Sequence, residues 1–252
     1  MKVDLHTHAS ERSGCSGSTE EEMIRAAIAF GLDGLAFTDH GRLVPEARLR
    51  ELNRQYAPFR VFGGIEITVL EGEDILIYGV RDAALNRSGW RYPELHSFAR
   101  AHGGAVVVAH PLRYKDHVNL DLKQFKPDAL EVHSINVGAC DEARIRAIAA
   151  EAQCHVICTS DAHWSGHAGM YHVRLQRPVE NGEDLADLIR RGAFDCAGDA
   201  ARIAEFNQEV SRREEAIRAM IAEGRDRTHY HDTTGEWEGH YDRVKMGKSY
   251  VI

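Results

Sequence analysis

The stretch Val3-Asp4-Leu5-His6-Thr7-His8 opens the chain with an apolar strand that ends in two histidines. Residues two apart in a strand point to the same face, so His6 and His8 are predicted to project together from one strand end. Two imidazoles placed in this way can give a metal ion two nitrogen ligands. Short His-x-His spacings also arise by chance among 15 histidines, so the prediction depends on what the later strands carry.

Strand-like and helix-like segments alternate from this stretch to about residue 198. Apolar runs predict strands at 3–8, 34–37, 61–70, 75–78, 105–108, 130–133, 156–158 and 173–179, and helical spacing predicts helices near 18–30, 45–56, 93–102, 141–151 and 183–190. The polar turn Glu71-Gly72-Glu73 predicts a hairpin between the strands that flank it. Such alternation predicts a largely parallel sheet with right-handed crossovers, and the number of units favours closure into a barrel. No glycine-rich dinucleotide fingerprint follows the first strand, which disfavours a Rossmann domain.

Metal-binding or acidic side chains end nearly every predicted strand. They are His6, His8, Asp39, His40, Glu66, His110, His133, Asp161 and His163. In a parallel barrel the carboxyl ends of the strands emerge at one face, so these groups are expected to converge. Buried without partners, each would cost several kcal/mol, which a bound metal would offset. The pattern therefore predicts a metal centre, and the number of ligands predicts more than one ion.

The alternation ends near residue 199. Apolar positions from Ile203 to Ile221 predict one long amphipathic helix that stops at Gly224. The remaining tail, 225–252, is polar, and its His229 and His231 are interpreted as solvated surface. We expect a barrel over 1–198 and a C-terminal helix and tail over 199–252 packed on it. Whether the tail drapes over the barrel or forms a dimer contact stays open, and so does a homo-oligomer.

Composition indicates a soluble globular protein of 252 residues, with 43% hydrophobic and 28% charged residues. No apolar run approaches the roughly 18 residues of a membrane span, and no signal sequence opens the chain, so a cytoplasmic location and no membrane partner are expected. The five cysteines are odd in number and irregularly spaced, which favours reduced thiols. Cys154 and Cys158 flank an apolar strand and are interpreted as buried, inert thiols.

A formal net charge of −8 argues against extended nucleic-acid binding through a broad basic face. A short oligonucleotide or a small phosphorylated substrate stays compatible, because bound metal cations can supply the local positive charge.

The motifs at these strand ends resemble those of the PHP (polymerase and histidinol phosphatase) family of metallophosphoesterases. The match covers residues 1–165 in family order. The matching motifs are Asp4-Leu5-His6-Thr7-His8, Thr38-Asp39-His40-Gly41, Gly64-Ile65-Glu66, Ala109-His110-Pro111, Glu131-Val132-His133 and Ser160-Asp161-Ala162-His163. The resemblance implies a distorted seven-stranded (β/α) barrel with two or three divalent ions (Zn, Mn or Fe) at the carboxyl ends of its strands. It also implies hydrolysis of phosphate esters.

Carried over residue by residue, the resemblance assigns the first metals to His6, His8, Glu66 and Asp161, with Glu66 bridging two ions. His110 and His133 would complete a second site, while His40 and His163 would serve a third metal or the edge of the first. Asp39 would support its neighbour His40.

The loop after His8 departs from the family pattern. Family members usually place a further His or Asp ligand there, whereas 9–15 contains neither. Cys15 or Glu11 could substitute, and a thiolate ligand would favour softer metals such as zinc over manganese.

The expected mechanism is attack on phosphorus by a hydroxide that bridges two metals, with Asp161 and His163 as catalytic residues. Loop cations at the same face are candidates for gripping the phosphate: Arg42, Arg113 or Lys115, and more weakly Arg12. Simple solvation of these loop cations is an equal alternative. His167 either lines the pocket or lies on the surface.

Several functions are compatible with these residues. The first is a phosphatase acting on a small phosphomonoester such as histidinol phosphate or a nucleotide. The second is a phosphodiesterase or nuclease acting on short nucleic acid or on cyclic or bis-phosphorylated nucleotides. A non-catalytic metal-binding domain is the third, and an amidohydrolase-like C–N hydrolase is a minor fourth.

Overall fold

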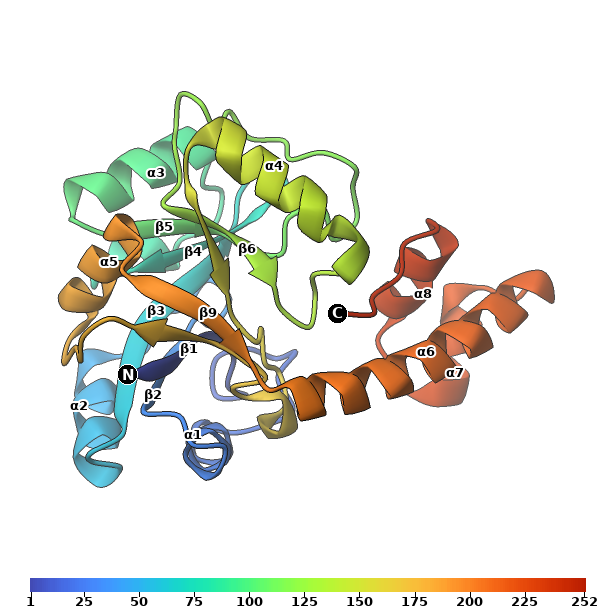
Figure 1. The fold of residues 1–252 in the computed structure, drawn as a ribbon, viewed down its shortest axis with the longest axis horizontal. Helices are drawn as coiled ribbons and strands as arrows, with labels where there is room; N and C mark the ends of the chain where they lie inside the picture. Colours follow the sequence, from blue (N-terminus) through green and yellow to red (C-terminus); the bar gives the residue numbers. More distant parts are fainter.

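One mixed sheet of nine strands forms the centre of the computed structural model, which describes residues 1–252 (Figure 1). Its strands follow the order β7-β6-β5-β4-β3-β2-β1-β8-β9, and the two end strands lie against each other, so the sheet is a nearly closed barrel. The predicted barrel-like α/β fold is confirmed. The strands are β1 (Lys2–Thr7), β2 (Gly34–Phe37), β3 (Arg60–Thr68), β4 (Asp74–Tyr78), β5 (Ala105–Val108), β6 (Ala129–His133), β7 (His155–Cys158), β8 (Tyr171–Leu175) and β9 (Phe194–Gly198).

The sheet has nine strands rather than seven because antiparallel strands join the parallel ones. β1, β2 and β3 run parallel, and so do β5, β6 and β7, whereas β4, β8 and β9 run antiparallel to their neighbours. The predicted hairpin of β3 and β4 is confirmed. β9 has the sequence Phe-Asp-Cys-Ala-Gly, which contains no apolar run, and pattern reasoning therefore missed it. Since β4 is antiparallel, its first residue lies at the edge where β3 and β5 end.

Five helices follow strands of the barrel, and three short 3-10 helices lie in its loops. The helix α1 begins where Thr19 and Glu22 form a capping box, each side chain accepting a hydrogen bond from the other's backbone N–H. The helices are α1 (Glu20–Ala29), α2 (Glu46–Gln55), α3 (Tyr92–Ala101), α4 (Glu142–Ala152) and α5 (Gly182–Arg191), with η1 (Ala83–Asn86), η2 (Ala139–Asp141) and η3 (Ser165–His167).

The strands that carry the histidines are anchored by complete burial. All residues of β2 and β5 are buried, as are five of the six in β1. Each large apolar side chain buried in this way, such as Leu5, contributes about 2 kcal/mol. The buried Tyr78 hydroxyl on β4 donates a hydrogen bond to the Leu5 carbonyl on β1, 2.7 Å away, and so ties two strands that are not neighbours in the sheet. The rigid barrel thereby fixes the strand ends.

The last 53 residues form three helices, α6 (Ala200–Ala222), α7 (Arg227–Thr234) and α8 (Glu238–Lys245). The predicted long helix is present, whereas the tail contains two short helices that its polar sequence did not reveal. Figure 1 shows α6 leading away from the barrel, with α7 and α8 folded back beside it. These helices share a small core of their own, formed by Val210, Ile217, Tyr230, Tyr241, Val244 and Tyr250. None of the helices is both long enough and apolar enough to cross a membrane.

Two of the five cysteines form a disulfide, Cys158 with Cys196, which corrects the expectation that all thiols are reduced. The two are 38 residues apart, but closure of the barrel brings β7 beside β9 and their Cα atoms to 5.3 Å. Spacing along the sequence could not reveal this pairing. Cys15, Cys140 and Cys154 are free, and Cys154 is partly buried.

Candidate metal centre

Seven of the eight predicted metal ligands form one cluster at the carboxyl ends of the parallel strands. They fall into groups of three whose ligand atoms all lie within 4.8 Å of one another. The groups are His6, His8 and Glu66; His6, His110 and Asp161; and His8, His40 and His163. All are buried except His163, which is partly exposed, and His40, whose side chain is 43% exposed. The cluster therefore opens to solvent on the side of these two histidines.

Glu66 occupies the centre of the cluster. Its Oε2 lies 3.1 Å from His40 Nδ1 and 3.3 Å from Nε2 of both His6 and His8. Its Oε1 lies 3.0 Å from His110 Nε2. A carboxylate whose two oxygens face different sets of imidazoles is suited to bridge two cations.

Asp161, in the loop after β7, faces the same imidazoles. Its Oδ1 lies 3.2 Å from His8 Nε2 and 3.3 Å from His6 Nε2. Its Oδ2 accepts a hydrogen bond of 2.6 Å from Asn136 Nδ2, which fixes the orientation of the carboxylate. Sequence reasoning gave Asn136 no role, because it lies in a loop after β6 without a recognisable motif.

Backbone strain is concentrated around the cluster. Of four non-glycine residues with positive φ, three lie in loops that carry it: His110 at +25°, Leu112 at +68° and Asp161 at +53°. Such conformations cost about 1–3 kcal/mol each and persist only where the surroundings enforce them, commonly at functional sites.

Glu131, which lies on β6 below the cluster, was quoted in a motif but given no role. Its Oε1 lies 2.7 Å from His6 Nδ1 and also accepts a hydrogen bond from the Thr159 hydroxyl. Its Oε2 accepts a hydrogen bond of 2.7 Å from the His110 backbone N–H. By fixing Nδ1 of His6, Glu131 leaves Nε2 directed at Glu66 and Asp161. The sequence feature that could have revealed this role is an acidic residue inside an otherwise apolar strand, where the structure buries it completely.

Asp74 is a further acidic residue at this face that sequence reasoning missed. It groups with Glu66 and His110, and its Oδ2 lies 3.9 Å from His110 Nε2. It begins β4, and because β4 returns antiparallel in the predicted hairpin, this residue lies at the edge where the parallel strands end. A prediction of ligands at the ends of strands passes over the start of one.

Asp39 supports the loop after β1 and does not face the cluster directly. Its Oδ1 accepts hydrogen bonds of 2.8 Å from both the Ala9 backbone N–H and the Ser13 hydroxyl. Its Oδ2 accepts one of 2.6 Å from Arg12 Nε. Arg12 also pairs with Glu20, so its charge is already compensated and it is not a free phosphate-binding group.

His133 lies apart from the cluster, contrary to the ligand role that the resemblance implied. Its ring stacks on Tyr171 with centroids 5.3 Å apart, and its Nε2 lies 3.6 Å from Glu142. The pairing of β6 with β7 is irregular between Glu131 and His133.

Replacing His133 with alanine is accordingly expected to change hydrolytic activity by less than about threefold, because no interaction with the cluster is lost. His110→Ala is the matched comparison, since it removes an imidazole that contacts Glu66. Steady-state rates of the two variants, with equal metal loading, check this expectation. A loss in His133→Ala as large as that in His110→Ala would contradict it.

In the loop after His8, the two proposed substitute ligands, Glu11 and Cys15, have different partners. The Glu11 carboxylate accepts hydrogen bonds of 3.2 and 3.0 Å from the Glu20 backbone N–H, at the start of α1. The Cys15 thiol instead interacts with the imidazoles of His40 and His163. Burial raises the pKa of Cys15, but these hydrogen bonds outweigh it and lower the pKa to about 6. Cys15 is thus the nearer of the two to the cluster, although it joins none of the groups whose ligand atoms lie within 4.8 Å of one another.

The two central carboxylates are held in their charged form. Burial alone would raise the pKa of Glu66, but attraction to His6 and a hydrogen bond from His110 hold it well below its usual range. The pKa of Asp161 is likewise well below its usual range, because His6 and His8 outweigh its burial. Both groups are acceptors at neutral pH, as metal ligation requires.

The imidazoles divide into two kinds. Burial opposes protonation of all of them, and for His8 it dominates and lowers the pKa to about 3. For His6 the carboxylates prevail and raise the pKa well above its usual value. Cys15 and Glu66 raise the pKa of His40 to about 9, and the pKa values of His110 and His163 are also raised. Without metal, protons on these rings balance the carboxylates.

Metal affinity is therefore expected to rise with pH from 6.5 to about 9, with release of protons. Below its pKa each ring holds a proton that the metal must displace, and above it that cost disappears. Calorimetric titration of the metal-free protein with Mn²⁺, in two buffers of different ionisation enthalpy, measures both quantities. An affinity that stays constant over this range would contradict the protonation pattern.

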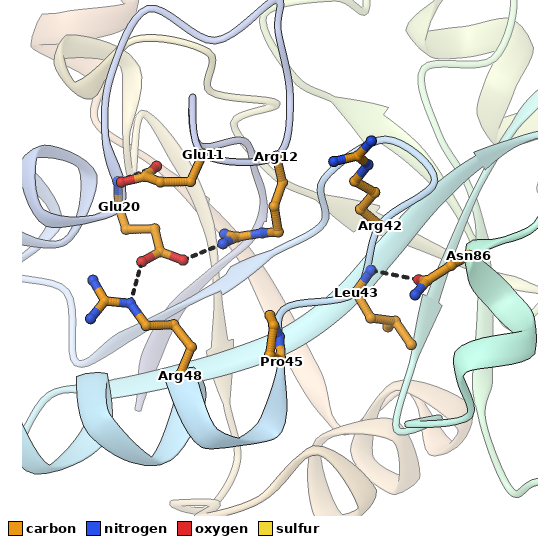
Figure 2. Close-up of a pocket in the computed structure, with 8 residues that line it drawn as sticks. All are labelled: Glu11, Arg12, Glu20, Arg42, Leu43, Pro45, Arg48 and Asn86. Carbon is orange, nitrogen blue, oxygen red and sulfur yellow. Dashed lines mark hydrogen bonds and ion pairs between the residues drawn. The ribbon is translucent and has the colours of Figure 1, made fainter.

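A cavity of about 610 Å³, within the size range of small-molecule sites, is lined by the loop after β1 and by the loop that follows His40, which carries Arg42 (Figure 2). Figure 2 shows Glu20 between two of the three arginines of its wall, Arg12 and Arg48, and it pairs with both. The third, Arg42, has no carboxylate partner, so its charge is the uncompensated one.

The other predicted loop groups differ in their availability. The Arg113 side chain makes no hydrogen bond or ion pair within the chain, and its guanidinium lies over the Trp237 ring, 4.5 Å from the centroid. Lys115 is engaged by the Gly72 carbonyl at 2.6 Å and by Glu73 at 2.8 Å, so it is not free to grip a phosphate. His167 packs edge-on against Phe206 of α6, away from the cluster.

Comparisons with known proteins agree with this geometry. The family model for the PHP domain matches residues 4–229, from β1 into α7. PsfC from Pseudomonas syringae aligns with a TM-score of 0.61 at 17% identity, over 82% of this chain and 96% of its own. An amidohydrolase from Chromobacterium violaceum, solved with bound sulfate and no metal, aligns with a TM-score of 0.58 at 16% identity. The alignment covers 80% of this chain and 100% of the amidohydrolase. The lesion-specific endonuclease EndoQ from Pyrococcus furiosus aligns with a TM-score of 0.54 at 16% identity. The alignment covers 77% of this chain and 57% of EndoQ. At these identities the likeness concerns the fold. No curated protein matches the chain.

Proposed function

The chain belongs to the PHP domain family of metal-dependent phosphoesterases, and from this premise we propose that it hydrolyses a small phosphomonoester, such as histidinol phosphate or a nucleotide. The observation that carries the proposal is Glu66, a buried carboxylate within 3.3 Å of four imidazoles.

The donor set at the cluster fits divalent metal ions. Buried imidazoles and ionised carboxylates stand close enough to share a cation, and no buried lysine or arginine neutralises Glu66 or Asp161. His6, His8, His110, Glu66 and Asp161 would hold the ions. When bound, divalent metals stabilise charge on phosphoryl oxygens and lower the pKa of a coordinated water to about 7.

Three residues of the chain would act on the substrate itself. His163 lies at the open edge of the cluster, with a pKa that burial lowers but Cys15 and Asp161 raise, and would donate a proton to the leaving oxygen. Arg113 would bind the phosphoryl oxygens through its unpaired N–H groups. Arg42, in the wall of the neighbouring cavity, would contact the rest of the substrate.

A small substrate is supported by the net charge of −8 and by a cavity wall with one uncompensated arginine. The sulfate in the Chromobacterium violaceum amidohydrolase is a tetrahedral oxyanion like phosphate, which agrees with anion binding in this fold. The likeness to the endonuclease EndoQ supports a second candidate, a phosphodiesterase or nuclease.

Hydrolysis of p-nitrophenyl phosphate and of bis(p-nitrophenyl) phosphate by the metal-reconstituted chain separates the two candidates, with His8→Ala as the control. The proposal predicts monoester turnover that His8→Ala loses. Turnover of the diester alone would overturn it in favour of the second candidate. If the metal-bound chain hydrolyses neither substrate, both candidate functions are contradicted and a non-catalytic metal-binding domain is favoured.

A further inference from the structure

The C-terminal segment, residues 227–252, is fastened to the loops that carry the cluster. Lys248 Nζ donates hydrogen bonds to the carbonyls of Leu112, at 2.6 Å, and Lys115, at 2.5 Å. Further along, the Ala139 backbone N–H donates to the Val251 carbonyl at 2.8 Å. In Figure 1 the C-terminus accordingly lies beside the loop after β6, next to α8. The segment therefore covers part of the face where the strands end.

A second contact connects the segment to a member of the cluster. The side chain of Arg243 on α8 is 1% exposed, and its Nη1 donates to the Asn136 carbonyl at 3.2 Å. Asn136 in turn donates its side-chain amide to Asp161 at 2.6 Å. One residue thus separates the C-terminal helices from a carboxylate of the cluster.

Arg113 is the group through which this segment can act on a substrate. Its guanidinium has no carboxylate partner, and its Nε is buried without a hydrogen-bond acceptor. Two aromatic rings hold it instead: Trp237, which lies immediately before α8, at 4.5 Å, and Tyr114 at 5.2 Å. An aromatic face restrains a guanidinium without occupying its N–H donors, so these remain free for an oxyanion.

Arg113 belongs to the loop that carries His110. It follows His110 by three residues, and its backbone N–H donates a hydrogen bond to the His110 carbonyl, 3.3 Å away. The guanidinium therefore extends from the same turn as an imidazole of the cluster.

The position of Trp237 is fixed by close packing. A Cβ added at Gly239, in the first turn of α8, would lie 2.5 Å from both the Trp237 ring and the Tyr114 hydroxyl. Any larger residue at 239 must displace both of these side chains. The start of α8 is therefore shaped to hold Trp237 against the loop that carries Arg113.

We propose that the C-terminal segment completes the active site, with Trp237 as a positioning residue that holds Arg113 over the cluster to bind the phosphoryl group of the substrate. This inference rests on the proposed function, because it concerns the anion that the same site takes. It implies that phosphate recognition depends on helices outside the barrel.

The test uses the full Mn²⁺-loaded chain and two readouts, turnover of p-nitrophenyl phosphate and calorimetric binding of inorganic phosphate. Trp237→Ala is expected to raise KM and the phosphate Kd about tenfold, with kcat within about twofold, because binding to substrate and transition state is lost equally. Trp237→Phe is expected to stay within about threefold of the parent, since an aromatic face remains. Gly239→Ala keeps the tryptophan but displaces it, and is expected to move both constants in the same direction as Trp237→Ala.

The matched control is Phe30→Ala. Phe30 is 43% exposed and Trp237 48%, and Phe30 also carries an arginine on its face, Arg202 at 3.6 Å, but it ends α1 away from the cluster. The Phe30→Ala substitution is expected to leave KM and the phosphate Kd unchanged. Arg113→Ala is expected to resemble Trp237→Ala, and the double variant to be no worse than Arg113→Ala alone, since both remove one interaction. If the double variant instead loses phosphate affinity by the product of the two single-variant factors, the inference is overturned.

The outcomes separate the inference from the function on which it rests. If the parent chain hydrolyses the monoester and Trp237→Ala and Gly239→Ala leave KM and phosphate binding unchanged, the inference fails and the function stands. If the parent chain binds phosphate in a manner that requires Trp237 but hydrolyses nothing, the function fails and the inference stands.

Discussion

Replacing Glu66 with glutamine is expected to lower phosphoesterase activity at least about a thousandfold, the largest effect of any single substitution in this chain. The Glu66 carboxylate faces four imidazoles within 3.3 Å, and its charge is what holds the cluster together. Glutamine has nearly the same shape but carries no charge, and its amide nitrogen would face imidazole nitrogens. Metal content per chain, measured after dialysis, is expected to fall along with activity.

Glu94→Gln serves as the control for this substitution. Glu94 is an exposed carboxylate on α3 that pairs with Arg87 at the surface, so the same chemical change there is expected to leave activity and metal content unaltered. Full metal content in Glu66→Gln, with activity within tenfold of the parent, would show that another group forms the centre of the site.

Replacing Glu131 with glutamine is expected to weaken metal binding about 10- to 100-fold, although Glu131 itself binds no metal. Both of its oxygens accept hydrogen bonds, from His6 and Thr159 on one side and from the His110 backbone on the other. A glutamine must turn its NH₂ group toward one of these donors, which leaves a buried donor unsatisfied. His6 then loses the partner that directs its other nitrogen into the cluster. Titration with Mn²⁺ measures the loss.

Here the control is Glu151→Gln, at an exposed carboxylate on α4 that pairs with Lys123. It is expected to retain the metal affinity of the parent. Thermal melting of both variants without metal distinguishes a loss of ligand orientation from a loss of fold. An unchanged metal affinity in a folded Glu131→Gln variant would contradict the supporting role of Glu131.

Much of the cluster could be predicted from sequence because its residues follow apolar strands directly. His6 and His8 end β1, and Glu66 lies within β3, so a period of two and the rule that parallel strands end at one face suffice to bring them together. His133 also ends a strand, β6, and was assigned to the cluster on the same ground, but its ring lies elsewhere. It stacks on Tyr171 at a point where the pairing of β6 with β7 is irregular, which no local pattern reveals.

What escaped sequence reasoning depends on contacts between distant segments. Asp74 reaches the cluster only because β4 runs antiparallel, and Cys158 meets Cys196 only because the barrel closes. The polar tail gave no sign of α7 and α8, because their shared core consists of a few tyrosines and aliphatic residues scattered among charges. Trp237 could not be related to Arg113, more than a hundred residues earlier, without the folded chain.

Anomalous diffraction from crystals of the Mn²⁺-loaded chain tests most directly whether the cluster of strand-end histidines and carboxylates is a metal centre. The expected result is at least two peaks adjoining Glu66, one bounded by His6, His8 and Asp161 and another adjoining His110, with none at His133. Peaks confined to other parts of the molecule, or none within the cluster, would contradict the metal centre and with it the proposed hydrolysis.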